Sequence, residues 1–185
     1  MFYGATSFDG DLSSWNVSSV TNMFGMFGGA ATYRGNLSSW NVASVTNMRS
    51  MFDNATAFDG DLSTWDVSSV TVMGSMFSGA YSFGGDISSW DVSSVRDASF
   101  MFLDAASFNG NLCDWGVRID TNSFVDGMFI GTSCPVQSIP DLSSNPPGPF
   151  CVLDCRSELQ NAVDAYLAAS SNATTDTGEF GGPIG

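Results

Sequence analysis

The sequence contains no lysine and no histidine, and only five arginines oppose its nineteen aspartates and glutamates. Without lysine and histidine, the chain lacks the base of the usual nucleophilic triads and the amine of Schiff-base chemistry. Carboxylate pairs such as Asp9 with Asp11 could serve a glycosidase. The same pair recurs at Asp59 and Asp61, however, and a real active site would break that symmetry. We therefore expect a protein that is not an enzyme and carries no organic cofactor.

The chain also lacks what a nucleic-acid-binding or membrane-spanning protein needs. Its net charge of -14 repels phosphates and anionic lipid surfaces. No apolar run is long enough to span a bilayer, and no charged-then-apolar leader opens the chain. Cysteine is missing before Cys113, and the cysteines then come in an even number. This pattern favours disulfides in a secreted or cell-surface protein.

A repeat with a period of 25 residues occupies most of the chain. Tryptophans recur at Trp15, Trp40, Trp65, Trp90 and Trp115. The Met-Phe pair keeps this spacing from Met1-Phe2 to Met101-Phe102 and then slips to 27 residues at Met128-Phe129. A fixed period in this range indicates a solenoid, in which each coil buries its apolar face against its neighbours. Because Met1 already occupies the methionine position of the repeat, we expect the true amino terminus, with any secretion signal, to lie upstream.

Two hydrophobic patterns alternate within each coil. Trp15 and Val17 flank the polar Asn16, which predicts a short strand with Trp and Val pointing inward. The 3-and-4 spacing of one helical face follows, at Val20, Met23, Met26, Phe27 and Ala30. The fold class is therefore predicted to be an α/β repeat solenoid, like a leucine-rich repeat, with a short parallel strand and a short helix in each coil. The glycine that recurs at Gly10, Gly35, Gly60, Gly85 and Gly110 suggests a backbone demand such as positive φ.

The solenoid is expected to occupy residues 1–130 and to end in a disulfide-stapled cap, residues 131–169. Cys134 is the expected partner of Cys113, and Cys151 and Cys155 are close enough to form a local loop. Four cysteines nevertheless permit three pairings, so the connectivity stays open. A helix is predicted near residues 156–169, and residues 170–185 read as a flexible tail or linker.

At these residues the chain resembles a known family. The coil W-N/D-V-S-S-V-T-N-M-x-x-M-F-x-x-A-x-x-F-x-G-D/N-L-S is similar to the BspA-like leucine-rich repeats, also catalogued as a mycoplasma surface-lipoprotein repeat. The resemblance covers residues 1 to about 130. The segments T-S-C-P and P-P-G-P-F-C resemble the carboxy-terminal cap of versions from marine single-celled algae. The resemblance implies a surface or secreted protein used in adhesion, recognition or assembly, and it brings no catalytic residues.

Aspartates that recur at equivalent positions of successive coils form acidic columns, and these columns are the candidate metal site. Stacking should place Asp61 one coil from Asp86, and Asp66 one coil from Asp91. Calcium accepts oxygen ligands in flexible geometry and could bridge each pair. Against this stands the simpler interpretation that these side chains cap turns and keep the protein soluble.

Four Asn-X-Ser/Thr sequons make Asn16, Asn36, Asn54 and Asn172 candidate glycosylation sites. The expected function is a non-enzymatic extracellular scaffold that binds other proteins or copies of itself, in adhesion or in a surface fibre. The alternative is a recognition module for glycans or calcium-bridged ligands. An ice-binding serine face is a further candidate, but threonine is largely absent from the serine columns.

Overall fold

The computed structural model describes residues 1–144 and 147–151 of the chain. One compact unit runs from Met1 to Leu153. A second unit, Asp154–Gly185, lies outside the described residues. The predicted helix near residues 156–169 and the predicted tail fall in that part of the chain, and the boundary predicted at residue 130 stays a prediction.

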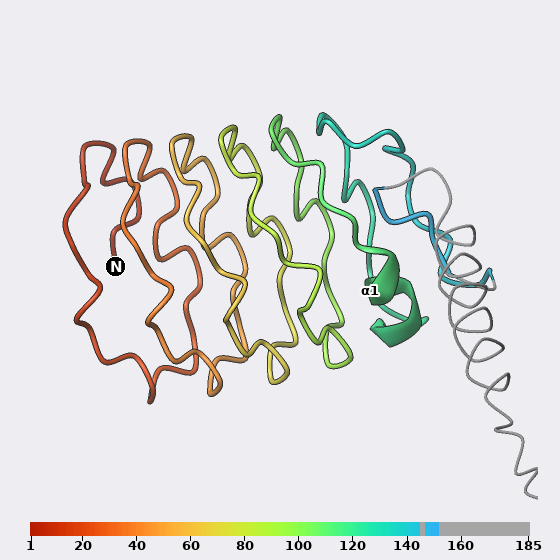
Figure 1. The fold of residues 1–185 in the computed structure, drawn as a ribbon, viewed down its shortest axis with the longest axis horizontal. Coiled ribbons are helices and arrows are strands. Elements are labelled where there is room, and N and C mark those ends of the chain that lie inside the picture. Colours follow the sequence, from red (N-terminus) through yellow and green to blue (C-terminus); the bar gives the residue numbers. More distant parts are fainter. Residues whose placement is uncertain (145–146, 152–185) are drawn as a thin grey trace, which may run out of the picture. The chain divides into compact units, whose positions relative to one another are not determined.

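The repeat folds into coils that lie side by side (Figure 1). We number them coil 1 (residues 12–36), coil 2 (37–61), coil 3 (62–86), coil 4 (87–111) and coil 5 (112–138). Isolated parallel bridges join them, pairing Asn22 with Asn47, Asn47 with Val72, Val72 with Asp97, and Asp97 with Phe124. The partners are 25 residues apart until the last step of 27. The predicted regular packing of successive repeats is therefore confirmed.

The strand predicted at Trp15 to Val17 is wrong, because the described residues contain no named strand and turns lie directly before and after this segment. The N–H of Trp15 donates to the carbonyl of Leu12 and closes a turn. Asn16 Oδ1 accepts hydrogen bonds from the N–H and the hydroxyl of Ser18. Such local bonds compete with a β ladder for the backbone donors. Parallel pairing is therefore confined to single bridges a few residues further along the coil.

The helix predicted from Val20 to Ala30 is also wrong. Each coil has two positions with a positive φ, and a right-handed helix cannot contain them. The first position is occupied by Gly25, Ser50, Ser75, Phe100 and Gly127, and the second by Gly4, Gly29, Asn54, Gly79, Asp104 and Gly131. These left-handed residues reverse the local curvature, so the segment becomes a series of turns.

Consecutive turns keep the apolar spacing of a helix but use a different set of hydrogen bonds. The N–H of Met26 donates to the carbonyl of Met23 within coil 1. The N–H groups of Met23 and Gly25 instead donate to the carbonyls of Asn47 and Arg49 in coil 2. Alternate residues therefore close a turn or bind the next coil, and apolar side chains three residues apart all face inward.

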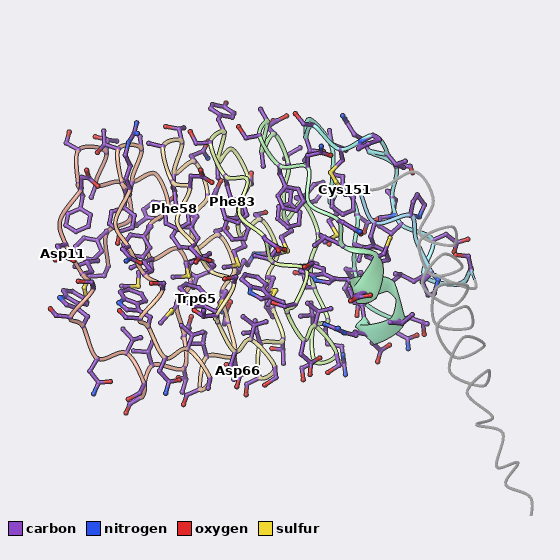
Figure 2. The ribbon with its side chains drawn as sticks, viewed as in Figure 1. Asp11, Phe58, Trp65, Asp66, Phe83 and Cys151 are labelled. Carbon is purple, nitrogen blue, oxygen red and sulfur yellow. A yellow bond between two sulfur atoms is a disulfide. The ribbon has the colours of Figure 1, made fainter. Side chains whose placement is uncertain are left out.

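Two columns of stacked aromatic rings run through the core. The first contains Phe2, Phe27, Phe52, Phe77, Phe102 and Phe129, and the second contains Phe8, Tyr33, Phe58, Phe83 and Phe108. Within coil 3 the centroids of Phe77 and Phe83 are 3.9 Å apart, and Phe83 lies 6.2 Å from Phe58 of coil 2. Figure 2 shows Phe58 and Phe83 in successive coils, with Trp65 inside the stack and Asp66 at its margin. Each coil therefore meets its neighbours through the same ring contacts.

The recurring glycine has a steric reason, and the positive φ expected for it is wrong. None of Gly10, Gly35, Gly60, Gly85 and Gly110 is among the positive-φ residues. A Cβ at Gly60 would instead lie 2.9 Å from the ring of Phe58, and one at Gly110 would lie 3.0 Å from Phe108. The aromatic ring two residues earlier folds over this position, which leaves no room for a side chain.

Coil 5 is two residues longer than the other coils, and it accommodates the extra residues by forming α1 (Cys113–Arg118) in place of turns. The N–H of Ile119 donates to the carbonyl of Trp115, the i to i−4 bond of a helix. Trp115 keeps its place in the tryptophan column, stacked 6.3 Å from Trp90. The extra residues are therefore accommodated locally, and the core continues without interruption.

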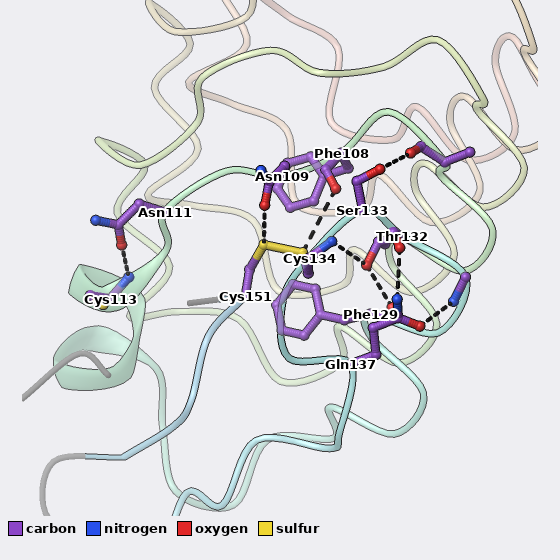
Figure 3. The surroundings of a disulfide bond; sticks show 12 residues. Phe108, Asn109, Asn111, Cys113, Phe129, Thr132, Ser133, Cys134, Gln137 and Cys151 are labelled. Carbon is purple, nitrogen blue, oxygen red and sulfur yellow. Dashed lines mark hydrogen bonds between the residues drawn. A yellow bond between two sulfur atoms is a disulfide. The ribbon is translucent and has the colours of Figure 1, made fainter. Parts of the chain in front are cut away.

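A disulfide joins Cys134 to Cys151 and closes the end of the array (Figure 3). The pairings expected from sequence, Cys113 with Cys134 and Cys151 with Cys155, are therefore wrong. Cys113 is also disulfide-bonded, and Cys155 lies outside the described residues. The expected connectivity relied on sequence proximity, whereas the stacking brings the Cα atoms of Cys134 and Cys151 to 4.8 Å. The predicted stapled cap is confirmed for this one disulfide.

Candidate functional site

The polar surface of the stack consists of short side chains that are bonded to the backbone of the preceding coil. Ser39 Oγ donates to the carbonyl of Ser13 at 2.8 Å, and Ser44 Oγ donates to that of Ser18 at 2.9 Å. Thr46 Oγ1 donates in the same way to the carbonyl of Thr21 at 3.1 Å. These bonds fix the rotamers of exposed groups, so the surface is ordered before any partner arrives.

The acidic columns lie on this surface as predicted, and each carboxylate binds its own turn. Asp61 Oδ1 accepts from the N–H of Ser63 at 2.9 Å, and the hydroxyl and N–H of Ser63 lower the pKa of Asp61. The hydrogen bonds from Ser68 likewise lower the pKa of Asp66. Asp91 acts in the opposite direction and raises the pKa of Asp66 through charge repulsion, which is the weaker influence. Asp61 and Asp66 therefore cap their own turns, and the charge of Asp91 also reaches Asp66 from the next coil.

The predicted calcium ligands come together in pairs only. Asp61 and Asp86 are near enough for the charge of Asp61 to raise the pKa of Asp86, while the N–H of Ser88 lowers it more strongly. Among residues 1–144 and 147–151, no three acidic, histidine or cysteine side chains gather as a metal would require. The calcium hypothesis for Asp61, Asp86, Asp66 and Asp91 stays a prediction.

Three of the predicted glycosylation sites are exposed. Asn16, Asn36 and Asn54 all lie at the surface, and Asn172 falls outside the described residues. Asn36 Oδ1 accepts from the N–H of Ser38, and Asn54 Nδ2 donates to Asp53. Glycan attachment at these residues stays a prediction.

An ion pair that skips one coil was missed by the sequence reasoning. Arg49 Nη1 of coil 2 lies 2.9 Å from Asp97 Oδ2 of coil 4. Gly74 of coil 3 lies between them, and a Cβ there would come within 3.0 Å of Asp97 Oδ2. The sequence did contain an indication of this contact. Gly74 has no side chain at a repeat position where the other coils carry Phe24, Arg49 and Ser99. This contact joins three successive coils across the bridge ladder.

One end of the stack is incompletely covered. We call it the open face and define it by Trp15, Val20, Asn22, Phe24 and Met26. Trp15 is 40% exposed, whereas Trp40, one coil further on, is 4% exposed. A hollow of about 210 Å³ is lined by these residues and by Met1. Trp15, Val20 and Met26 are thus less buried than their equivalents Trp40, Val45 and Met51 in coil 2.

The opposite end of the described stack is closed. Phe150 is fully buried, and a Cβ on Gly116 of α1 would lie 2.7 Å from the carbonyl oxygen of Pro147. Trp115 is accordingly only 1% exposed. The two ends of the described stack therefore differ in how far their core positions are covered.

No helix in the described part of the chain is long and apolar enough to cross a bilayer.

Comparison with known proteins finds a match to the model of a family described as "Mycoplasma protein of unknown function, DUF285". The match covers residues 1–65 and, in a second overlapping alignment, residues 35–141. No curated protein and no solved structure matches significantly.

Proposed function

The chain belongs to the DUF285 family, a Mycoplasma family of unknown function, and from its geometry we propose that it is a non-enzymatic scaffold for protein–protein contact, adhesion or assembly at a cell surface. The observation that carries this proposal is the ordered polar surface, in which hydroxyls such as those of Ser39 and Thr46 are fixed by bonds to the preceding coil. A partner that binds such a surface loses little additional side-chain entropy. The finer likeness to BspA-like leucine-rich repeats and to algal proteins is part of the same proposal.

The first experiment asks whether the purified chain assembles. Light scattering over a range of protein concentrations, followed by electron microscopy of the same samples, should detect particles larger than one chain or defined complexes with a co-purified surface protein. A protein that stays monomeric at all concentrations and co-purifies with no partner would contradict the scaffold role. The matched variant is Thr46→Arg with Thr71→Arg, which adds bulk to an exposed column and leaves the core unchanged.

The second experiment asks where the protein is located. Because the sequence contains no lysine, amine-reactive surface labels report only on the α-amino group. Protease treatment of intact cells is therefore the better assay, with an antibody against the chain as the readout. Loss of the antibody signal on intact cells is expected, and full protection in intact cells together with digestion after lysis would contradict an extracellular location.

Glycan or calcium-dependent recognition is the second candidate. The paired exposed carboxylates, such as Asp66 and Asp91, favour it because each is held in a fixed orientation by its own turn. A glycan array with and without calcium separates the two functions. Reproducible sugar binding favours recognition, whereas assembly without any ligand favours the scaffold. Mass spectrometry with and without glycosidase tests occupancy of Asn16, Asn36 and Asn54.

A further inference from the structure

We propose that an exposed apolar patch on coils 4 and 5 binds a segment of another protein in which apolar side chains adjoin arginine or lysine. We call it the apolar patch and define it by Phe100, Phe124 and Ile130, which are 43%, 64% and 48% exposed. Large apolar side chains that gather on the surface of a soluble protein are a mark of interaction sites. The proposal rests on the scaffold function above and names one binding site and the chemistry of its partner.

Phe100 of coil 4 and Ile130 of coil 5 meet beside a glycine. A Cβ at Gly127 would lie 2.5 Å from the ring of Phe100 and 3.4 Å from Cδ1 of Ile130. Both side chains therefore border the same backbone position, which has no side chain of its own. A larger residue at position 127 would displace the ring, so Gly127 allows Phe100 to lie at the surface next to Ile130.

Phe124 extends the apolar patch along the same pair of coils. The N–H of Ala98 donates to the carbonyl of Phe124, and the N–H of Phe100 donates to that of Asp126, both at 2.8 Å. Phe124 and Asp126 are exposed, and they flank the buried Val125. The patch is therefore built on backbone hydrogen bonds between coils 4 and 5 and is present before any partner binds.

The three apolar side chains depart from the repeat. At the equivalent positions coil 1 carries Asn22, Gly25 and Gly28, and coil 2 carries Asn47, Ser50 and Asp53. These coils stack through the same core rings as coils 4 and 5, so stacking does not require apolar residues at these positions. A surface that breaks the repeat while the core preserves it indicates a function outside the stack.

Phe100 also has a backbone conformation that bulky residues avoid. Its φ is 57°, in the left-handed region, where coil 1 has Gly25 and coil 5 has Gly127. This conformation costs free energy, and strained residues of this kind gather at binding sites. Because 43% of Phe100 is exposed, burial within the chain offsets only part of that cost. A partner that covers the ring would complete its burial.

Carboxylates that have no cationic neighbour border the apolar patch. Asp126 precedes Gly127, and the N–H of Asp104 donates to the carbonyl of Ile130 at 2.7 Å. Both aspartates are exposed, and neither forms an ion pair within residues 1–144 and 147–151. Three other aspartates do form ion pairs with arginine, namely Asp97, Asp114 and Asp120. A partner with arginine or lysine beside its apolar side chains would therefore match both the patch and its border.

A second copy of this chain does not have that chemistry. The sequence contains no lysine, and three of its five arginines, Arg49, Arg96 and Arg118, already form ion pairs. Two copies with a net charge of -14 each also repel one another. Residues 152–185 are acidic too, since Arg156 is their single cation. The charges therefore favour a different, basic protein as the partner.

The first test asks whether the apolar patch is free in the chain of 185 residues. In hydroxyl-radical footprinting read by mass spectrometry, Phe124 should be labelled at a rate close to that of the exposed Phe24 and well above that of the buried Phe102. Protection of Phe124 to the level of Phe102 would overturn the proposal, because residues 152–185 or a second copy would then already cover the patch.

The second test selects ligands for the whole chain from a phage-displayed library of random dodecapeptides. The counter-target is the variant Phe100→Ser, Phe124→Asn and Ile130→Ser, in which each new residue is one that an earlier coil carries at the same position. Peptides that bind the native chain and not this variant should be rich in arginine or lysine next to leucine or aromatic residues. Selection of peptides without cations, or of none specific to the native chain, would overturn the proposal.

The strongest selected peptide is then synthesised and titrated into two charge variants made without glycosylation. Asp104→Asn with Asp126→Ser should weaken binding about tenfold, since two exposed ion pairs are lost. These residues copy Asn54 and Ser99 at the equivalent positions, so the fold is retained. The matched control Asp61→Asn with Asp66→Asn removes the same charge elsewhere and should leave the affinity unchanged. Equal affinities for both variants would overturn the predicted role of the acidic border.

These outcomes are separate from the fate of the scaffold function. If no peptide binds the apolar patch but the chain still assembles or binds a surface protein through its hydroxyl columns, only this proposal is lost. If the peptide binds and the chain nevertheless stays inside the cell, the scaffold function at a surface is lost and the binding site is retained.

Discussion

At the scale of single residues, one hydroxyl distinguishes Tyr33 from the phenylalanines at the same position of the other coils. Tyr33 is fully buried and its hydroxyl has no hydrogen-bond partner. Burial, together with the charges of Asp9 and Asp11, raises the pKa of Tyr33. An unsatisfied polar group in a core costs free energy that the ring packing must offset. The column would therefore be more stable with phenylalanine at this position.

We expect Tyr33→Phe to raise the free energy of unfolding by about 1 kcal/mol, since it removes an unpaired buried hydroxyl. The reciprocal change Phe58→Tyr should lower it by about 1–3 kcal/mol, because the new hydroxyl would meet the same packed surroundings near Gly60. Denaturant unfolding of both variants measures the difference. A destabilised Tyr33→Phe variant would show that the hydroxyl has a partner, such as a bound water, that stabilises the fold.

The aspartates that cap turns predict how stability depends on pH. Serine hydrogen bonds hold the pKa values of Asp61, Asp66, Asp86 and Asp91 below the ordinary value of 3.8. A carboxyl whose pKa is lower in the folded state contributes stability above its unfolded pKa and loses it as the pH falls through its folded pKa. Stability should therefore fall as the solution is acidified below about pH 4.

Replacing these four aspartates by asparagine should shift the acid-unfolding midpoint to lower pH. At pH 7 we expect each change to alter the free energy of unfolding by less than about 0.5 kcal/mol, as exposed substitutions usually do. Asn36 and Asn41 already fill the same positions in coils 1 and 2 and form the same bonds to Ser38 and Ala43. The variant should be made without glycosylation, since it gains sequons. An unchanged acid midpoint would mean that other carboxyl groups with a lowered pKa, such as Asp120 and Asp141, dominate acid unfolding.

At the scale of the coil, position in the stack decides what a tryptophan contributes. Trp65→Ala should lower the free energy of unfolding by about 3–5 kcal/mol, because it empties a core site between two coils. Trp15→Ala should cost less than about 2 kcal/mol, since 40% of Trp15 is exposed and its indole donates to no described acceptor. Equal losses for the two variants, measured by denaturant unfolding, would contradict an open face at Trp15.

The buried side chains of a coil could be predicted from sequence, but its backbone could not. The period and the apolar spacing identified the inward residues correctly, from Trp40 to Phe129. The same spacing suggested a helix, because turns closed every three residues bring apolar side chains to one face as a helix does. Gly29, Asn54 and Asp104 were a usable warning, since these residue types tolerate a left-handed backbone.

The other left-handed position gave no such warning. Ser50, Ser75 and Phe100 adopt positive φ there although their side chains do not favour it. Their conformation is imposed by hydrogen bonds to the next coil, as in Ser50 N–H to the carbonyl of Gly74. A preference that arises from stacking cannot be detected within one coil. The pairing of Cys134 with Cys151 was hidden for the same reason, because contacts between distant segments determine it.

The candidate surfaces were predicted in part. The aspartate columns and three sequons could be placed at the surface because they occupy polar positions beside buried ones. The apolar patch could not be predicted, because its three side chains adjoin one another only through the stacking of coils 4 and 5. Tyr33 and the Arg49–Asp97 pair depend on packing that no local pattern encodes.

At the scale of the whole array, stability should vary along the described stack. Each coil contacts only its neighbours, so an end coil that lacks half a neighbour should open more often than an internal one. The N–H groups of Met23 and Met73 both donate to the following coil. We expect the amide of Met23 to exchange about ten times faster than that of Met73 in native-state hydrogen exchange.

Reduction of the disulfides should make the amides at the carboxy-terminal end of the described stack exchange faster as well. Once Cys134 and Cys151 are released, the amides of Ala98 and Phe100, which donate to Phe124 and Asp126, should lose protection before those of Met48 and Ser50 do. Uniform exchange along the array, with and without reductant, would mean that the coils open together. The disulfide would then contribute to one global transition and not to the local stability of coil 5.

The regular register between coils also determines how easily the gene can gain or lose whole repeats. Because Met23 N–H meets Asn47 as Met73 N–H meets Asp97, a duplicated stretch of DNA that encodes one full period would insert a coil whose contacts already exist on both sides. Recombination between repeats could therefore lengthen or shorten the protein without redesigning its interior. Closely related strains should then differ in the number of coils far more readily than in the residues that pack them.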